Sequence, residues 1–161
     1  MSALPHCNLT PDEYLANERQ AEFKSEYYDG LAYVLAGASE KHNTIAGNCF
    51  AELHAKLKSR DCKIYINDMK VRAPNSHKFF YPDVLVVCGP PQFHDNRQDT
   101  VLNPLLVIEV LSDSAAAYDN SKKFWSYQQI ESLQEYVLVA QDDFTVESYR
   151  RAANGDRKSV V

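Results

Sequence analysis

Two short apolar runs, 80–88 (FYPDVLVVC) and 105–111 (LLVIEVL), have the β-branched composition of buried strands. Each run also carries one carboxylate, Asp83 in the first and Glu109 in the second. An ionised carboxylate inside a dry sheet is costly unless it is paired with a cation or bound to a metal. The pattern that predicts the strands therefore also marks two candidate functional residues.

Before these strands, the pattern predicts a helix and a hairpin. Thr10 can cap a helix whose third position holds Glu13, as in a capping box, and this helix is expected to run to about residue 19 or 21. Asp29-Gly30 is typical of a tight hairpin turn. The strands on either side of this turn are expected at 23–28 and 31–35.

Two further helices are predicted, at about 40–59 and 118–131. The first follows Ser39 as a cap and has apolar residues at helical spacing, namely Ile45, Cys49, Phe50, Leu53 and Leu57. Four more extended segments complete the chain. We expect 62–66 and 69–73 as an extended pair or one bulged strand, and 135–140 and 144–150 as a final hairpin followed by a loop tail.

The resulting order of helices and strands predicts an α/β or α+β mixed domain built around one mixed β-sheet. The chain of 161 residues suits a single domain, 1–161. No apolar run approaches the roughly 20 residues that span a bilayer, and the N-terminus lacks the features of a signal peptide. A cytoplasmic location is therefore expected.

Composition and charge narrow the function classes. The formal net charge of −5 counts against a protein that coats nucleic acid through a basic face, although it leaves a nucleic-acid enzyme open because a metal site itself needs carboxylates. The four cysteines contain no C-x-x-C pair, so a structural zinc site is disfavoured. We expect reduced, mostly buried thiols.

Asp83 and Glu109 together predict a metal site. Mg²⁺ prefers oxygen ligands and usually takes one or two carboxylates plus waters, and a cation between two neighbouring acids would relieve their repulsion. A metal held this way can activate water and stabilise charge on a phosphate. The structural alternative is that Asp83 accepts backbone hydrogen bonds at a strand start and that Glu109 pairs with a lysine.

Several stretches of the chain, in order, resemble the Uma-two family of restriction-endonuclease-like bacterial proteins, within the PD-(D/E)XK nuclease superfamily. The matching stretches are TPDEYL (10–15), EYYDG (26–30), AGAS with HN (36–43), DMKVR (68–72), FYPDVLVV (80–87), VIEVLS (107–112), YDNSKKFWSY (118–127) and EYVLV (135–139). The resemblance implies a restriction-endonuclease-like fold, a central mixed sheet flanked by helices, a Mg²⁺-dependent phosphodiesterase site (Mn²⁺ as a substitute) and a homodimer.

Carried over residue by residue, the resemblance makes Asp83 and Glu109 acidic metal ligands and Glu26 an additional acid. The superfamily pattern places its lysine two residues after the second acid, where this chain has Leu111. The resemblance instead implies Lys123, on the following helix, as the catalytic lysine. An ordinary surface role for Lys123 is the alternative.

Other polar residues have two interpretations. His42 either lines the site or makes a local hydrogen bond at a helix start. Lys70 is either a substitute catalytic lysine or an exposed charge at a strand edge, and Asp68 is either a further ligand or a turn residue. Trp125 is expected in the core or half-buried in a sheet.

The sequence thus favours a metal-dependent endonuclease that acts on nucleic acid, with DNA as the first candidate. The alternative from another class is a nuclease fold that serves as a catalytically silent binding or assembly module, which the acidic charge and the displaced lysine favour. Hydrolysis of a small phosphoester is a third option.

Overall fold

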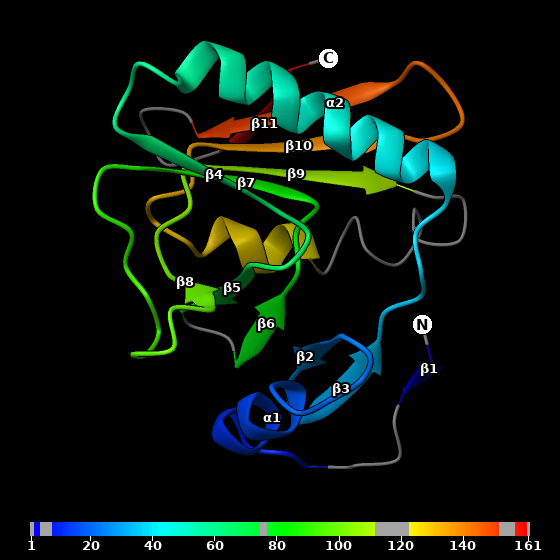
Figure 1. Ribbon diagram of the computed structural model, residues 1–161, viewed down its shortest axis with the longest axis vertical. Helices are drawn as coiled ribbons and strands as arrows, with labels where there is room; N and C mark the ends of the chain where they lie inside the picture. Colours follow the sequence, from blue (N-terminus) through cyan, green and yellow to red (C-terminus); the bar gives the residue numbers. More distant parts are fainter. Residues whose placement is uncertain (1, 4–7, 75–76, 112–122, 152–156, 161) are drawn as a thin grey trace.

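The computed structural model describes residues 2–3, 8–74, 77–111, 123–151 and 157–160. Within these residues the helices are α1 (Pro11–Glu18), α2 (Glu40–Leu57) and a short helical segment at 123–128. The strands form two six-stranded mixed sheets (Figure 1). The mixed α+β fold class predicted from the sequence is therefore confirmed.

The first sheet has the order β1-β3-β2-β6-β5-β8. Its strands are β1 (Ser2–Ala3), β3 (Leu31–Val34), β2 (Ser25–Tyr28), β6 (Lys78–Phe80), β5 (Lys70–Ala73) and β8 (Thr100–Val101). The second sheet has the order β12-β11-β10-β9-β7-β4. Its strands are β12 (Arg157–Val160), β11 (Val146–Arg151), β10 (Glu135–Ala140), β9 (Leu106–Leu111), β7 (Val84–Cys88) and β4 (Cys62–Ile66).

The two sheets are layered with helices. In Figure 1, α2 lies across the outer face of the second sheet, and the helix at 123–128 lies between the sheets. The main core occupies the same space, because Tyr127 and Ile130 pack there against residues of both sheets. On the far side of the first sheet, α1 packs through Tyr14 and Leu15.

Alternation along the strands assigns residues to these layers. On β6, Phe80 belongs to the core between the sheets, whereas its neighbour Phe79 packs against α1. On β2, Tyr28 and Tyr27 divide in the same way. Successive side chains of a strand point to opposite faces, so a strand that is buried on both faces reads as a continuous apolar run.

The expectation of one central sheet was wrong. The apolar run 80–88 is divided between the sheets, because β6 ends at Phe80 and β7 begins at Val84. Pro82, which cannot donate to a strand ladder, stands in the link between them. Likewise, 62–66 and 69–73 do not pair, since β4 belongs to the second sheet and β5 to the first.

The local signals were read correctly. Thr10 Oγ1 accepts a hydrogen bond from the Glu13 backbone N–H at 3.2 Å, and the Glu13 carboxylate accepts one from the Thr10 N–H at 2.8 Å, which completes the capping box. Asp29 and Gly30 both have positive φ, 46° and 98°, as the hairpin turn between β2 and β3 requires. Ser39 caps α2.

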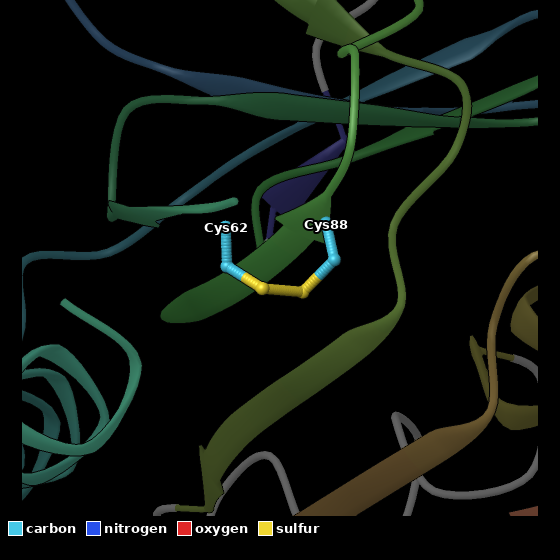
Figure 2. Close-up of a disulfide and its surroundings, with 2 residues drawn as sticks. All are labelled: Cys62 and Cys88. Carbon is cyan, nitrogen blue, oxygen red and sulfur yellow. A yellow bond between two sulfur atoms is a disulfide. The ribbon is translucent and has the colours of Figure 1, made fainter. Parts of the chain in front are cut away.

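The expectation of reduced thiols was wrong for two of the four cysteines. Cys62 and Cys88 form a disulfide between β4 and β7 (Figure 2). The two residues are direct partners in the antiparallel register of these strands, which brings their side chains within bonding reach. Their separation of 26 residues hides this proximity in the sequence. Cys49 is a half-buried free thiol, and Cys7 lies outside the described residues.

Two other expectations also failed. The tail predicted as loop contains β12, which pairs antiparallel with β11. Trp125 is 64% exposed instead of buried. The start of the helix predicted at 118–131 lies outside the described residues. Within the described part of the chain, this helix runs from 123 to 128 and so ends three residues before the predicted end. Among the described residues, no helix combines the length and the apolar composition needed to cross a bilayer.

Candidate active site

A cavity of about 1030 Å³ opens where the two sheets approach the N-terminal end of α2. The four residues that the sequence and its family resemblance singled out, Asp83, Glu109, Glu26 and Lys123, all contribute to its lining. They come from four separate segments, namely the β6–β7 link, β9, β2 and the helix at 123–128. The fold thus brings together residues that are up to 97 positions apart in the chain, from 26 to 123.

Asp83 is held by two donors. The backbone N–H of Val110 donates to Oδ2 at 2.7 Å, and His42 Nε2 donates to Oδ1 at the same distance. The first contact links the β6–β7 junction to β9, and the second links it to α2. The carboxylate therefore has a defined orientation on the cavity wall, and each oxygen keeps a lone pair for another partner.

Glu109 lies in the middle of β9 and is 6% exposed. Its Oε1 accepts a hydrogen bond of 3.0 Å from the Tyr127 hydroxyl and lies 3.6 Å from Lys123 Nζ. The pKa of the Tyr127 phenol is raised well above its ordinary value, mainly by burial and to a lesser degree by the nearby charge of Glu109. Tyr127 therefore stays protonated and acts as a hydrogen-bond donor to this carboxylate.

Glu26 is completely buried and is surrounded by donors. Lys123 Nζ lies 2.9 Å and the Tyr81 N–H 3.0 Å from its Oε1, and the Tyr28 hydroxyl donates to Oε2 at 3.0 Å. Lys123, itself 5% exposed, thus stands between the carboxylates of Glu26 and Glu109. Buried charges persist when paired and hydrogen-bonded in this way.

His42, for which the sequence left open a place in the site or a local hydrogen bond, lines the cavity and contacts Asp83. It points toward Asp83, and this hydrogen bond raises the pKa of its imidazole above the ordinary value, against the opposing effect of burial. His42 and its neighbours Ser39 and Asn43 belong to the first turn of α2 and its cap, and all three line the cavity. The positive end of the helix dipole therefore faces a cavity that contains carboxylates.

The other candidates lie outside the cavity. Lys70 is 4% exposed, which contradicts the expected exposed strand edge, and its Nζ is 3.2 Å from Asp99. Asp68 is exposed and forms an ion pair with Lys24. Neither Lys70 nor Asp68 belongs to the described cavity lining.

Sequence reasoning missed the tyrosines that organise the site. The hydroxyls of Tyr28 and Tyr127 donate to the buried glutamates, and Tyr81 adds only its backbone N–H. An aromatic residue in an apolar stretch is first read as core. One signal was available, because Tyr127 stands four positions after Lys123 and such residues share a helix face. Their shared face is the one that contacts Glu109.

A family model described as "Uma2: Putative restriction endonuclease" matches residues 11–161. The chain belongs to this family. The resemblance drawn from the ordered sequence motifs is therefore confirmed over almost the whole chain, and it gives the protein a nuclease-like family identity. The match covers every segment that contributes a residue to the cavity.

Two proteins of one Synechocystis strain are similar to this chain over most of its length. An uncharacterized protein of Synechocystis sp. (strain ATCC 27184 / PCC 6803 / Kazusa), sll1609, is 43% identical over 95% of this chain and 85% of its own length. A second one from the same organism, slr1290, is 35% identical over 94% of this chain and 79% of its own length.

A solved structure shares the fold. It is a crystal structure titled as "a putative nuclease belonging to DUF820 from Anabaena variabilis ATCC 29413", with a TM-score of 0.76 and 20% sequence identity. The likeness covers 94% of this chain and 83% of that one. It confirms the nuclease-like fold predicted for this Uma2 chain.

The donor set of the cavity fits Mg²⁺ in one particular way. Among the described residues, no group of three or more histidine, cysteine or acidic side chains is placed to hold a metal ion. Asp83 and Glu109 offer the two carboxylates that Mg²⁺ commonly takes, with waters and substrate oxygens completing its shell. The chemistry of these two side chains therefore matches the oxygen ligands that Mg²⁺ prefers.

Proposed function

We propose that the protein is a metal-dependent nuclease that hydrolyses phosphodiester bonds of nucleic acid, with DNA as the first candidate substrate. The observation that carries the proposal is the meeting of Asp83, Glu109 and Lys123 in one cavity. Two acids and a lysine around a recess large enough for a phosphate are the groups that this chemistry needs. Membership of the Uma2 family supports the same reaction class.

In this proposal Asp83 and Glu109 hold Mg²⁺, or Mn²⁺ as a substitute. When bound, the cation would lower the pKa of a water and offset negative charge on the phosphate. The protein's contribution is orientation, since the Val110 N–H and His42 hold Asp83 while Tyr127 holds Glu109. Such supporting hydrogen bonds fix the orientation of each ligand carboxylate.

Lys123 supplies the fixed positive charge. Its ammonium lies within 3.6 Å of Glu109, so it stands next to the position where the phosphate would bind. A preorganised cation in a recess stabilises the charge that develops on the phosphoryl oxygens in the transition state. Glu26, predicted as an additional metal ligand, engages both of its oxygens with donors, and these contacts favour a role in holding Lys123.

One observation favours the silent binding module. The ammonium of Lys123 is already paired, within the protein itself, with the carboxylates of Glu26 and Glu109. A nuclease fold that had lost its metal could keep such a group for stability alone. The two functions separate on carboxylate-dependent metal binding.

The test is Mg²⁺ and Mn²⁺ titration calorimetry together with nicking of supercoiled plasmid. The variants are Asp83→Asn and Glu109→Gln, which preserve side-chain volume, and the control is Glu52→Gln, an exposed acid on α2. The nuclease proposal expects metal binding and nicking to be lost together in both site variants and kept in the control. A folded wild type that binds neither cation would contradict the nuclease proposal and favour the binding module.

A further inference from the structure

We propose that the cavity accepts a phosphodiester whose neighbouring base is unpaired, and that this base stacks on Phe23 at the cavity rim. The inference rests on the proposed nuclease function and specifies its substrate as a single-stranded or locally opened nucleic acid. Three observations carry it: the exposure of Phe23, the depth of the reactive groups and the charge of the cavity.

Phe23 is 64% exposed and lines the cavity. The described residues contain three other large, exposed apolar side chains, and none of these belongs to the described cavity lining. They are Trp125, Phe144 and Val146. Phe23 therefore differs from the other exposed apolar side chains because it lies at the cavity.

The segment that carries Phe23 is fixed in place. The next residue, Lys24, extends the β2–β3 pairing, because its carbonyl accepts a hydrogen bond of 2.9 Å from the Leu35 N–H. The Lys24 side chain is also anchored, since Nζ donates to the Asn67 carbonyl at 3.2 Å and pairs with Asp68. A ring on such a segment provides a preformed platform, which lowers the entropic cost of binding a flat ligand.

The reactive groups lie deeper than Phe23. The side chains of Asp83, Glu109 and Lys123 are 15%, 8% and 6% exposed. A phosphate must therefore enter the recess to reach them, which a flexible single strand can do more readily than a stacked duplex. Enzymes that act on recessed nucleotides use single strands or extrude the nucleotide from the helix, and unstacked bases bind on aromatic side chains.

The charge of the cavity argues for the same substrate. Its described lining contains the carboxylates of Glu22, Glu26, Asp83 and Glu109 but only two lysines. Repeated contacts to backbone phosphates, which give most non-specific duplex binding, have no basic surface here. Base stacking supplies affinity without phosphate contacts and tolerates any base.

The experiment measures binding of fluorescent single-stranded DNA and RNA 12-mers and of the blunt DNA duplex by anisotropy, with Ca²⁺ in place of Mg²⁺ to separate binding from cleavage. We expect Phe23→Ala to weaken single-strand binding about ten-fold, which is within the measured range for one stacked base. Phe23→Leu should be equally weak, and Phe23→Tyr should bind like the wild type. Phe144→Ala, which removes an exposed ring outside the cavity lining, is the matched control and should change nothing.

Two results overturn the inference: duplex binding as tight as single-strand binding, or a Phe23→Ala variant that binds single strands like the wild type. Plasmid nicking, measured separately, tests the nuclease function. Nicking that does not depend on Phe23 would leave the nuclease in place and refute the base-stacking site. Phe23-dependent binding of single strands without any cleavage by the wild type would support the stacking site and refute the nuclease.

Discussion

Replacing Lys123 with Met should destabilise the protein strongly, although methionine is apolar and of similar length. The substitution removes the ammonium 2.9 Å from Glu26, a carboxylate with no exposure to water. It also removes the cation 3.6 Å from Glu109. The hydrogen bonds that Glu26 accepts from Tyr28 and Tyr81 persist, but they do not neutralise its charge.

The expected cost is about 3–5 kcal/mol, the range for removing one partner of a buried ion pair. Because domains are stable by only about 5–15 kcal/mol, such a loss leaves a marginal protein. For a chain of this size it lowers the melting temperature by about 10 °C. Replacing Glu26 with Gln in the same chain removes the uncompensated charge and keeps an oxygen for the Tyr81 N–H, so the double variant should recover about 2 kcal/mol.

Urea unfolding at pH 7, followed by circular dichroism, measures these differences for Lys123→Met, Glu26→Gln and the double variant. The control is Lys56→Met on α2, whose side chain is 74% exposed and whose partner Glu52 is 3.8 Å away, so its stability should change little. A Lys123→Met protein as stable as the wild type would refute the reasoning. A double variant less stable than Lys123→Met would refute it as well.

Three further predictions follow from contacts away from the site. Thr10→Ala removes the capping-box acceptor of α1 and should lower the free energy of unfolding in urea by about 1 kcal/mol. A variant as stable as the wild type would contradict this role of the cap. Replacing both Cys62 and Cys88 with Ser should cost about 3 kcal/mol, because the unfolded chain is then no longer closed into a loop and gains conformational entropy. Thiol titration of the native wild type should show both sulfurs unreactive. The hydrogen bond to Arg19 holds the pKa of the Asp99 carboxyl below its ordinary value, so Asp99 stabilises the fold at neutral pH and this contribution is lost as the pH falls below about 4 toward the folded pKa. The stability difference between wild type and Asp99→Asn should therefore shrink between pH 7 and pH 3, and an unchanged difference would contradict the assignment.

The sequence by itself determined the local elements and pointed to four residues that line the cavity. The cap of α1, the turn at Asp29-Gly30 and the start of α2 depend on residues within a few positions of each other, so the information is contiguous in the chain. The family motifs likewise pointed to Asp83, Glu109, Glu26 and Lys123 before any contact was known. Their assigned chemistry stays a prediction until metal binding is measured.

Only the tertiary structure decided which elements are neighbours. An apolar run indicates that a strand is buried but not which strand it pairs with. For that reason the run 80–88, which joins the end of β6 to β7, predicts one strand, and 62–66 and 69–73 predict an extended pair or one bulged strand. The same limit concealed the Cys62–Cys88 bond, the burial of Lys70 and the position of Lys123 between two glutamates. Each of these depends on non-local contacts, because the chain closes its site by packing two sheets around a helix whose partners are distant in sequence.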